Sequence, residues 1–164
     1  MNDTDRPFRA YAIHWRPPEA IPSTLVCPCC KQIRDVATET PLPAIETHMR
    51  DTGSDPDRRP PGWSVAAAAR GELYWACSRC IEGGAALVGQ PWRQRWRDFE
   101  PYLAYYDHRL HCEDCDTDFI FAAAEQQHWY ETLRFWVQAY PKQCLDCRRK
   151  RRDHQRLMRE QNGD

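Results

Sequence analysis

The sequence is poor in the side chains that normally build a core. Leu, Ile, Val and Phe together number 25 of 164 residues, a content at which a chain often cannot bury enough apolar surface to fold unaided. No apolar run approaches the roughly 20 residues that cross a bilayer, so we expect no membrane partner. Nine cysteines and seven tryptophans are the evident substitutes: metal–thiolate bonds and a few large rings.

The first residues also lack the basic and apolar regions of a secretory signal, so we expect a reducing, cytoplasmic compartment without disulfides. The odd number of cysteines agrees with this expectation. Lysine is scarce, with 3 Lys against 20 Arg, a bias that we interpret as that of a GC-rich bacterial genome. The formal net charge of −1 gives no overall attraction to nucleic acid.

Eight cysteines form four Cys-x2-Cys pairs. Such spacing lets a tight turn aim two sulfurs at one point, and two pairs complete the tetrahedral thiolate shell that zinc favours. The sequence therefore predicts two structural zinc ions, with these metal ligands: Cys27, Cys30, Cys77, Cys80, Cys112, Cys115, Cys144 and Cys147. Thioredoxin-like redox chemistry, the alternative, needs one pair and not four. We expect Cys29 to be a spare turn residue, because Cys27 and Cys29 are too close for a standard pair.

The spacing leaves the pairing of the ligands open. The third and fourth pairs are separated by 28 residues and the first and second by 46. Sequential pairing and interleaved cross-bracing both use all eight ligands.

The C-terminal third resembles the probable zinc-ribbon domain family. Its pattern is Cys-x2-Cys, Phe-x-Phe, Glu-Gln with an aromatic pair, then Pro-Lys-x-Cys-x2-Cys-Arg. The positions that carry it are Cys112, Cys115, Phe119, Phe121, Glu125, Gln126, Trp129, Pro141, Lys142, Cys144, Cys147 and Arg148; Asp116 stands where the family usually has glycine. The resemblance implies sequential pairing for the second site and a fold, but no activity.

The expected fold class is a small, metal-stabilised α+β protein: two zinc-ribbon-like modules, each with a four-cysteine zinc site, joined by an aromatic-rich helix and followed by a basic helix. The expected parts are an N-terminal strand or extension (1–20), a first zinc module (21–90) with a Pro-rich insertion (41–62), a connecting helix (91–106), a zinc ribbon (107–150) and a basic C-terminal helix (148–164).

Local patterns predict the elements inside these parts. Alternation of Tyr11, Ile13 and Trp15 predicts an edge strand. Short helices are expected at 44–50, 63–70 and 123–130, a strand at 72–76, and a hairpin from 107–111 and 118–121. Between residues 91 and 106 a helical stripe predicts a packed aromatic face, and a base-stacking platform is the alternative; its members are Trp92, Trp96, Phe99 and Leu103.

The charges form two opposed patches. Residues 148–159 carry seven basic and one acidic residue, whereas residues 98–118 carry seven acidic and one basic. An arginine-rich helix can neutralise phosphates and release counterions, so we expect binding of nucleic acid or a ribonucleoprotein. The expected contacts are Arg148, Arg149, Arg151, Arg152, Arg156 and Arg159. The alternatives to nucleic-acid binding are that the basic segment is simply solvated or that it folds back on the acidic patch.

We expect a non-enzymatic protein. A protein–protein adaptor that uses the aromatic surface and the Pro-rich insertion as contacts is the main alternative function, because fold alone cannot decide between the two. A remote alternative is a zinc deaminase, since His111 and Glu113 with Cys144 and Cys147 superficially match the His-x-Glu and Cys-x2-Cys signature. Against it, Cys112 and Cys115 already complete a four-thiolate shell.

Overall fold

The computed structural model describes residues 21–39, 41–52, 61–97 and 99–161. Its elements follow this order: β1 (Thr24–Val26), β2 (Ile33–Asp35), the 3-10 turn η2 (Val36–Thr38), α1 (Pro41–Thr52), α2 (Trp63–Ala69), α3 (Ser78–Glu82), β3 (Leu87–Val88), the 3-10 turn η3 (Pro91–Arg93), β4 (Ala104–Tyr105), β5 (His108–His111), β6 (Asp118–Phe121), α4 (Ala123–Gln127), the π-helical turn η4 (His128–Thr132) and α5 (Leu145–Gln161). The expected N-terminal strand at Tyr11, Ile13 and Trp15 lies outside the described residues.

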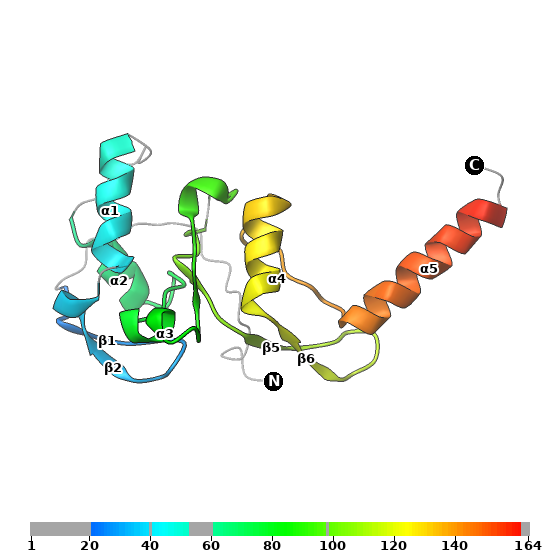
Figure 1. Ribbon diagram of the computed structural model, residues 1–164, viewed down its shortest axis with the longest axis horizontal. Coiled ribbons are helices and arrows are strands. Elements are labelled where there is room, and N and C mark those ends of the chain that lie inside the picture. Colours follow the sequence, from blue (N-terminus) through cyan, green and yellow to red (C-terminus); the bar gives the residue numbers. More distant parts are fainter. Residues whose placement is uncertain (1–20, 40, 53–60, 98, 162–164) are drawn as a thin grey trace.

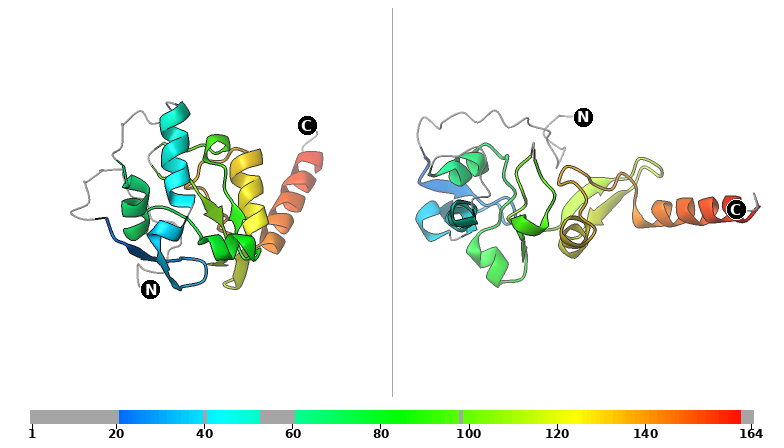
Figure 2. Two further views of the ribbon diagram at one scale, coloured as in Figure 1. Left: turned by 60° about the vertical axis from the view of Figure 1, so that its left-hand side comes forward. Right: turned by 90° about the horizontal axis from the view of Figure 1, so that it is seen from above.

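Two small bodies and an arm make up the molecule (Figure 1). The first body holds β1, β2 and α1 to α3, the second holds β5, β6 and α4, and α5 projects from the second body away from the first (Figure 2). Each of the three sheets is one antiparallel pair: β1 with β2, β3 with β4, and β5 with β6. This is the small α+β architecture expected from the sequence. Within the described parts of the chain, no helix has the length and apolar character needed to cross a membrane.

The first body is built around α1 and α2. Residues Leu42, Ile45 and Met49 of α1 are buried, at the three- and four-residue spacing that places side chains on one helical face. The Glu46 carboxylate accepts hydrogen bonds from the backbone N–H groups of Gly62 and Ser64, each at 2.9 Å, and so caps the start of α2. The expected insertion at 41–62 therefore contributes to the core.

The prediction of a connecting helix at 91–106 is wrong. After the short turn η3, the described residues 94–97 and 99–103 form no helix, and β4 then pairs with β3. The Gln94 side chain accepts from the Tyr102 N–H at 2.8 Å and donates to the Tyr102 carbonyl at 2.7 Å, which takes backbone groups that a helix would have used. Pro101 opposes a helix there as well. The strand expected at 72–76 shrinks to one parallel bridge between Tyr74 and Tyr102.

A stack of tyrosines joins the two bodies. The Tyr102 ring lies between those of Tyr74 and Tyr130, with centroids at 4.7 and 4.8 Å. Tyr74 and Trp96 pack against both core clusters. Of the aromatic stripe predicted at 91–106, Leu103 is buried and Trp96 half-buried, while Trp92 is 56% exposed and contacts His48 of α1. The packed-face interpretation thus fits Leu103, Trp96 and Phe99, the last of which is half-buried against the second core cluster, although these residues do not share a helix.

Replacing Gln94 by alanine should lower the free energy of unfolding by about 2–4 kcal/mol, because a buried N–H and a buried carbonyl would both lose their partner. Denaturant unfolding at fixed zinc concentration measures this. The exposed Gln138 provides the matched control, and Gln138→Ala should change stability by less than about 0.5 kcal/mol. Equal effects of the two substitutions would contradict the role of Gln94.

Acid should destabilise the fold through His108, which contacts the rings of Tyr74 and Tyr106. Burial lowers the pKa of His108 from 6.5 to about 4, so the unfolded chain takes up a proton between these values while the folded chain does not. The contribution of neutral His108 to the free energy of unfolding is therefore fully present above pH 6.5. It decreases below that pH, by about 2 kcal/mol at pH 5. His108→Phe should show a loss between pH 7 and pH 5 that is smaller by this amount. If the free energy of unfolding fell equally between pH 7 and pH 5 in the two proteins, the role of His108 would be refuted.

Candidate metal centres

The first sulfur cluster joins the β1–β2 hairpin to the start of α3. Its members are Cys27, Cys30, Cys77 and Cys80, whose sulfur atoms all lie within 4.8 Å of one another. The Cys30 and Cys77 sulfurs are 3.8 Å apart, and those of Cys77 and Cys80 are 3.4 Å apart. Residues far apart in the sequence therefore converge on one point.

The second cluster joins the β5–β6 hairpin to the start of α5. Cys112, Cys115, Cys144 and Cys147 bring their sulfur atoms within 4.8 Å of one another, and the Cys115 and Cys144 sulfurs are 3.8 Å apart. Both clusters agree with sequential pairing of the ligands.

Both donor sets fit zinc. Four sulfurs at about 2.3 Å from a tetrahedral zinc ion lie about 3.8 Å from one another, close to the separations seen in both clusters. All nine cysteines are free thiols. The chain thus carries two four-cysteine sites that can each hold one zinc ion, and bound zinc would supply a covalent-strength tie between hairpin and helix.

The two sites share one backbone construction. In each, the first cysteine accepts a hydrogen bond through its sulfur from the N–H of the third: Cys77 to Cys27 at 3.3 Å, and Cys144 to Cys112 at 3.2 Å. Each hairpin is closed by an N–H of its first cysteine donating to the carbonyl five residues on, both at 2.9 Å. The first pair of every site therefore lies in a hairpin turn.

The second pair of each site lies in the first turn of a helix. Cys77 is the N-cap of α3, which contains Cys80, and α5 begins at Leu145, between Cys144 and Cys147. The basic helix therefore starts three residues before the predicted position. The exposed N–H groups and positive dipole end of a helix favour thiolates there.

Both hairpin turns need a left-handed residue just after the second cysteine. Lys31 has φ of 61° and Asp116 has φ of 58°, in a region that L-residues other than glycine enter at a cost. Asp116 takes the place of the family's glycine and still makes this turn. Its carboxylate lies 2.7 Å from Nε2 of His111, a contact that helps to fix the turn.

Hydrogen bonds favour the thiolate form of one cysteine in each cluster, Cys30 and Cys112. A backbone hydrogen bond from Gln32, together with the Arg34 guanidinium, lowers the pKa of Cys30 to about 6. Burial acts to raise the pKa of Cys112, but the backbone N–H groups of Cys144, Asp114 and Cys115 lower it to about 6. Burial and neighbouring sulfurs raise the pKa of Cys80. A divalent cation relieves this competition between close sulfurs.

Several supporting residues could not be identified from the sequence. Arg34 Nη2 donates to the Cys30 sulfur at 3.7 Å. The Glu39 carboxylate accepts from the Ser78 N–H at 2.7 Å and so caps α3 next to the ligands. Glu39 lies 39 residues before Ser78, and no local spacing signals such a cap. For Arg34, the position four residues after a ligand is the one available signal.

His111 and Cys29 lie outside the ligand sets. Both ring nitrogens of His111 face carboxylates, Asp118 at 3.0 Å and Asp116 at 2.7 Å. The His-plus-two-Cys shell of the deaminase pattern is therefore not assembled. The Cys29 sulfur donates to the carbonyl of Ala85 at 3.6 Å, and Cys29 is not a member of the first sulfur cluster.

All six predicted nucleic-acid contacts lie on α5. Arg148 differs from the others because its guanidinium lies 2.8 Å from Glu125 and above the Trp129 ring, 5.6 Å from the centroid. Arg149, Arg151, Arg152, Arg156 and Arg159 are exposed.

Comparison with known proteins locates one zinc domain. Residues 106–156 match the family model described as a probable treble clef domain, a zinc-binding fold, in agreement with the zinc-ribbon-like domain expected there. The match covers less than a third of the chain. No curated protein and no solved structure matches the chain.

Native mass spectrometry should find two zinc ions per chain, and Cys30→Ser or Cys147→Ser should each remove one. Cys29→Ser is the matched control and should retain both. Because structural zinc contributes on the order of 10–16 kcal/mol, strong chelation should unfold both bodies, as seen by loss of near-ultraviolet circular dichroism. Loss of one ion from Cys29→Ser would place Cys29 in the shell.

Proposed function

We propose that this chain is a non-enzymatic zinc protein that binds nucleic acid, free or within a ribonucleoprotein, through α5. One observation carries the proposal: α5 is a 17-residue helix without a buried residue, and it extends away from both bodies (Figure 2). A helix that buries no apolar face gains nothing from a core. Its exposed surface is therefore available for a partner.

The charge of that surface favours phosphate. α5 carries seven basic and three acidic residues. Its ion pairs are Arg148 with Glu125, Arg149 with Asp146 and Arg156 with Asp153, the last two at 3.8 and 3.5 Å on exposed side chains. Among the described residues, no carboxylate lies within ion-pair distance of Lys150, Arg151, Arg152 or Arg159. Binding of such residues to phosphates would release the counterions condensed on the nucleic acid.

The acidic patch does not neutralise the arm. Within the described part of residues 98–118, no carboxylate pairs with α5; Asp118 contacts Arg109 and His111, and Glu113 lies 3.4 Å from Lys142. The positive field of α5 is thus open to solvent, as steering of a polyanion requires.

The anchor of α5 fixes the direction of the arm. Cys144 and Cys147 hold its first turn at the second metal centre. The next residue, Arg148, contacts Glu125 and Trp129 through its guanidinium group. A rigid mount keeps Arg152, Arg156 and Arg159 on one stripe, at spacings of four and three. Such a stripe can follow one strand or groove of nucleic acid.

A protein adaptor is the second candidate function, favoured by the β1–β2 hairpin. Val26 and Ile33 are cross-strand partners and are 56% and 71% exposed. An exposed apolar pair beside a rigid zinc site is a small contact surface for another protein. It is far from the basic arm, so the two functions are separable by mutation.

Replacing Arg152, Arg156 and Arg159 together by alanine should weaken duplex DNA binding and reduce the slope of log K against log salt by about 2.7, because each phosphate contact contributes about 0.9. Fluorescence anisotropy across a salt series measures the slope. Alanine retains helix propensity, so helix and zinc contents should not change.

The matched control removes the same charge elsewhere. Arg50, Arg93 and Arg97 lie away from α5, and their triple replacement by alanine should leave the slope unaltered. Equal slopes for the wild type and the α5 variant would remove α5 from the binding surface. If the wild-type chain binds no DNA at low salt, nucleic-acid binding is refuted and the protein adaptor becomes the proposed function.

A further inference from the structure

We propose that the groove between α5 and the turn after η4 binds single-stranded nucleic acid, with a base on Phe135 and the adjoining phosphates on Arg151 and Arg152. This inference rests on the proposed function and names the form of nucleic acid that the arm takes. The groove has a volume of about 420 Å³. One wall carries Trp129, Leu133 and Phe135, and the other carries Arg151, Arg152 and Gln155.

The first wall presents rings and an aliphatic side chain to solvent. Phe135 is 42% exposed and Leu133 is 47% exposed. The Phe135 ring stands perpendicular to that of Trp129, with centroids 5.2 Å apart, so the two rings are not stacked face to face. Between them in sequence, Arg134 has φ of 57°, a conformation that arginine rarely adopts. Two backbone hydrogen bonds hold this turn: the Leu133 N–H donates to the His128 carbonyl at 2.9 Å, and the Phe135 N–H donates to the Trp129 carbonyl at 3.1 Å.

The second wall presents unneutralised charge. Arg151 and Arg152 have no carboxylate within ion-pair distance among the described residues, whereas Arg148, at the base of the groove, is already paired with Glu125. Cationic guanidinium groups facing an exposed ring match a ligand that is anionic and planar at once. Nucleotides have this combination, with phosphate and base on neighbouring positions.

A single strand fits better than a duplex. In a duplex the faces of the bases are covered by their neighbours, so an exposed ring gains nothing from them. An unpaired base can leave its stack and lie on an aromatic side chain, with sequence-tolerant affinity. Stacking on Phe135 combined with phosphate contacts is the pattern of single-strand binding grooves.

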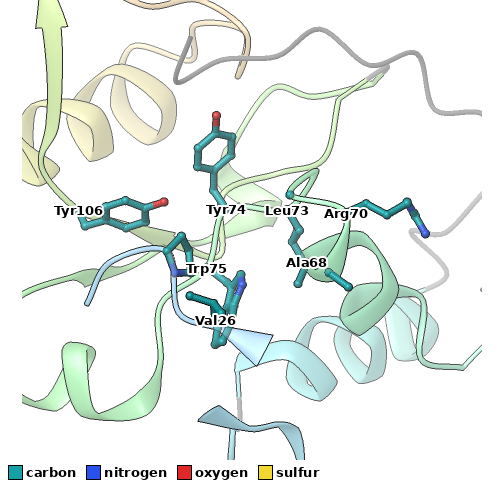
Figure 3. A pocket seen from close by; sticks show the side chains of 10 residues that line it. Val26, Ala68, Arg70, Leu73, Tyr74, Trp75 and Tyr106 are labelled. Carbon is teal, nitrogen blue, oxygen red and sulfur yellow. The ribbon is translucent and has the colours of Figure 1, made fainter. Parts of the chain in front are cut away.

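The other described hollow lacks this combination. It has a volume of about 330 Å³ and lies in the first body, lined by Val26, Leu73 and Trp75 among others. Arg70, its one charged residue within the described chain, extends away from the other labelled side chains (Figure 3) and pairs with Glu72 at 2.7 Å. No charge remains there for an anionic ligand.

Fluorescence anisotropy of the zinc-loaded full chain with labelled oligothymidylate, oligouridylate and a duplex of equal length tests the groove. Phe135→Ala should weaken single-strand binding by about 5- to 150-fold, the range for loss of one stacked base, and leave duplex affinity unchanged. Phe135→Tyr keeps the ring and should bind like the wild type. Trp92→Ala, an exposed aromatic outside the groove, is the matched control and should also bind like the wild type.

The outcomes separate this inference from the proposed function. If single strands and duplex both bind and Phe135→Ala binds single strands as tightly as the wild type, the groove is overturned and the arm still binds nucleic acid. If no oligonucleotide binds, both proposals fail. The tighter of the two single strands identifies DNA or RNA as the preferred ligand. Should Phe135→Ala lose zinc, the comparison of Phe135→Leu with Phe135→Tyr gives the same test.

Discussion

This structure depends on two clusters, in each of which four cysteine sulfurs come together at one point. The chain has few aliphatic residues, and the strands in its described parts are two to four residues long, too short to hold sheets together by themselves. Each cluster ties a hairpin to a helix that is distant in sequence. Around these two ties the small cores form, and the tyrosine stack of Tyr74, Tyr102 and Tyr130 then joins one body to the other.

The sequence predicted the clusters well because metal-ligand spacing is a local signal. Four pairs of cysteines, each with its members three residues apart, indicate metal sites, and the hairpin of β5 and β6 was predicted around the third pair. The connecting helix failed for the opposite reason. Its periodicity at Trp92, Trp96 and Phe99 was real, but the Gln94 side chain occupies both backbone groups of Tyr102, eight residues further on. A contact of that kind has no signature in composition or spacing.

The likeness of the two metal centres was equally hidden. Outside the cysteines, their hairpins share little sequence, since Lys31 stands in one where Asp116 stands in the other. What they share is backbone: the same left-handed turn, the same N–H to sulfur bond, and a second pair of ligands at a helix start. The groove beside α5 could not be predicted from the sequence either. Phe135 and Arg151 both line it, although the chain between them contains two ligands of the second metal centre.

The exposed α5 raises a question of helix stability. Starting a helix in water costs about 4 kcal/mol, the free-energy equivalent of a nucleation constant near one in a thousand, and an isolated helix of this length is marginal. Two cysteines of the second cluster fix the first turn of α5, so a bound metal would serve as the nucleus from which the remaining turns propagate. Metal occupancy would then set the length of the ordered basic arm, and zinc availability would control the reach of this protein as well as its fold.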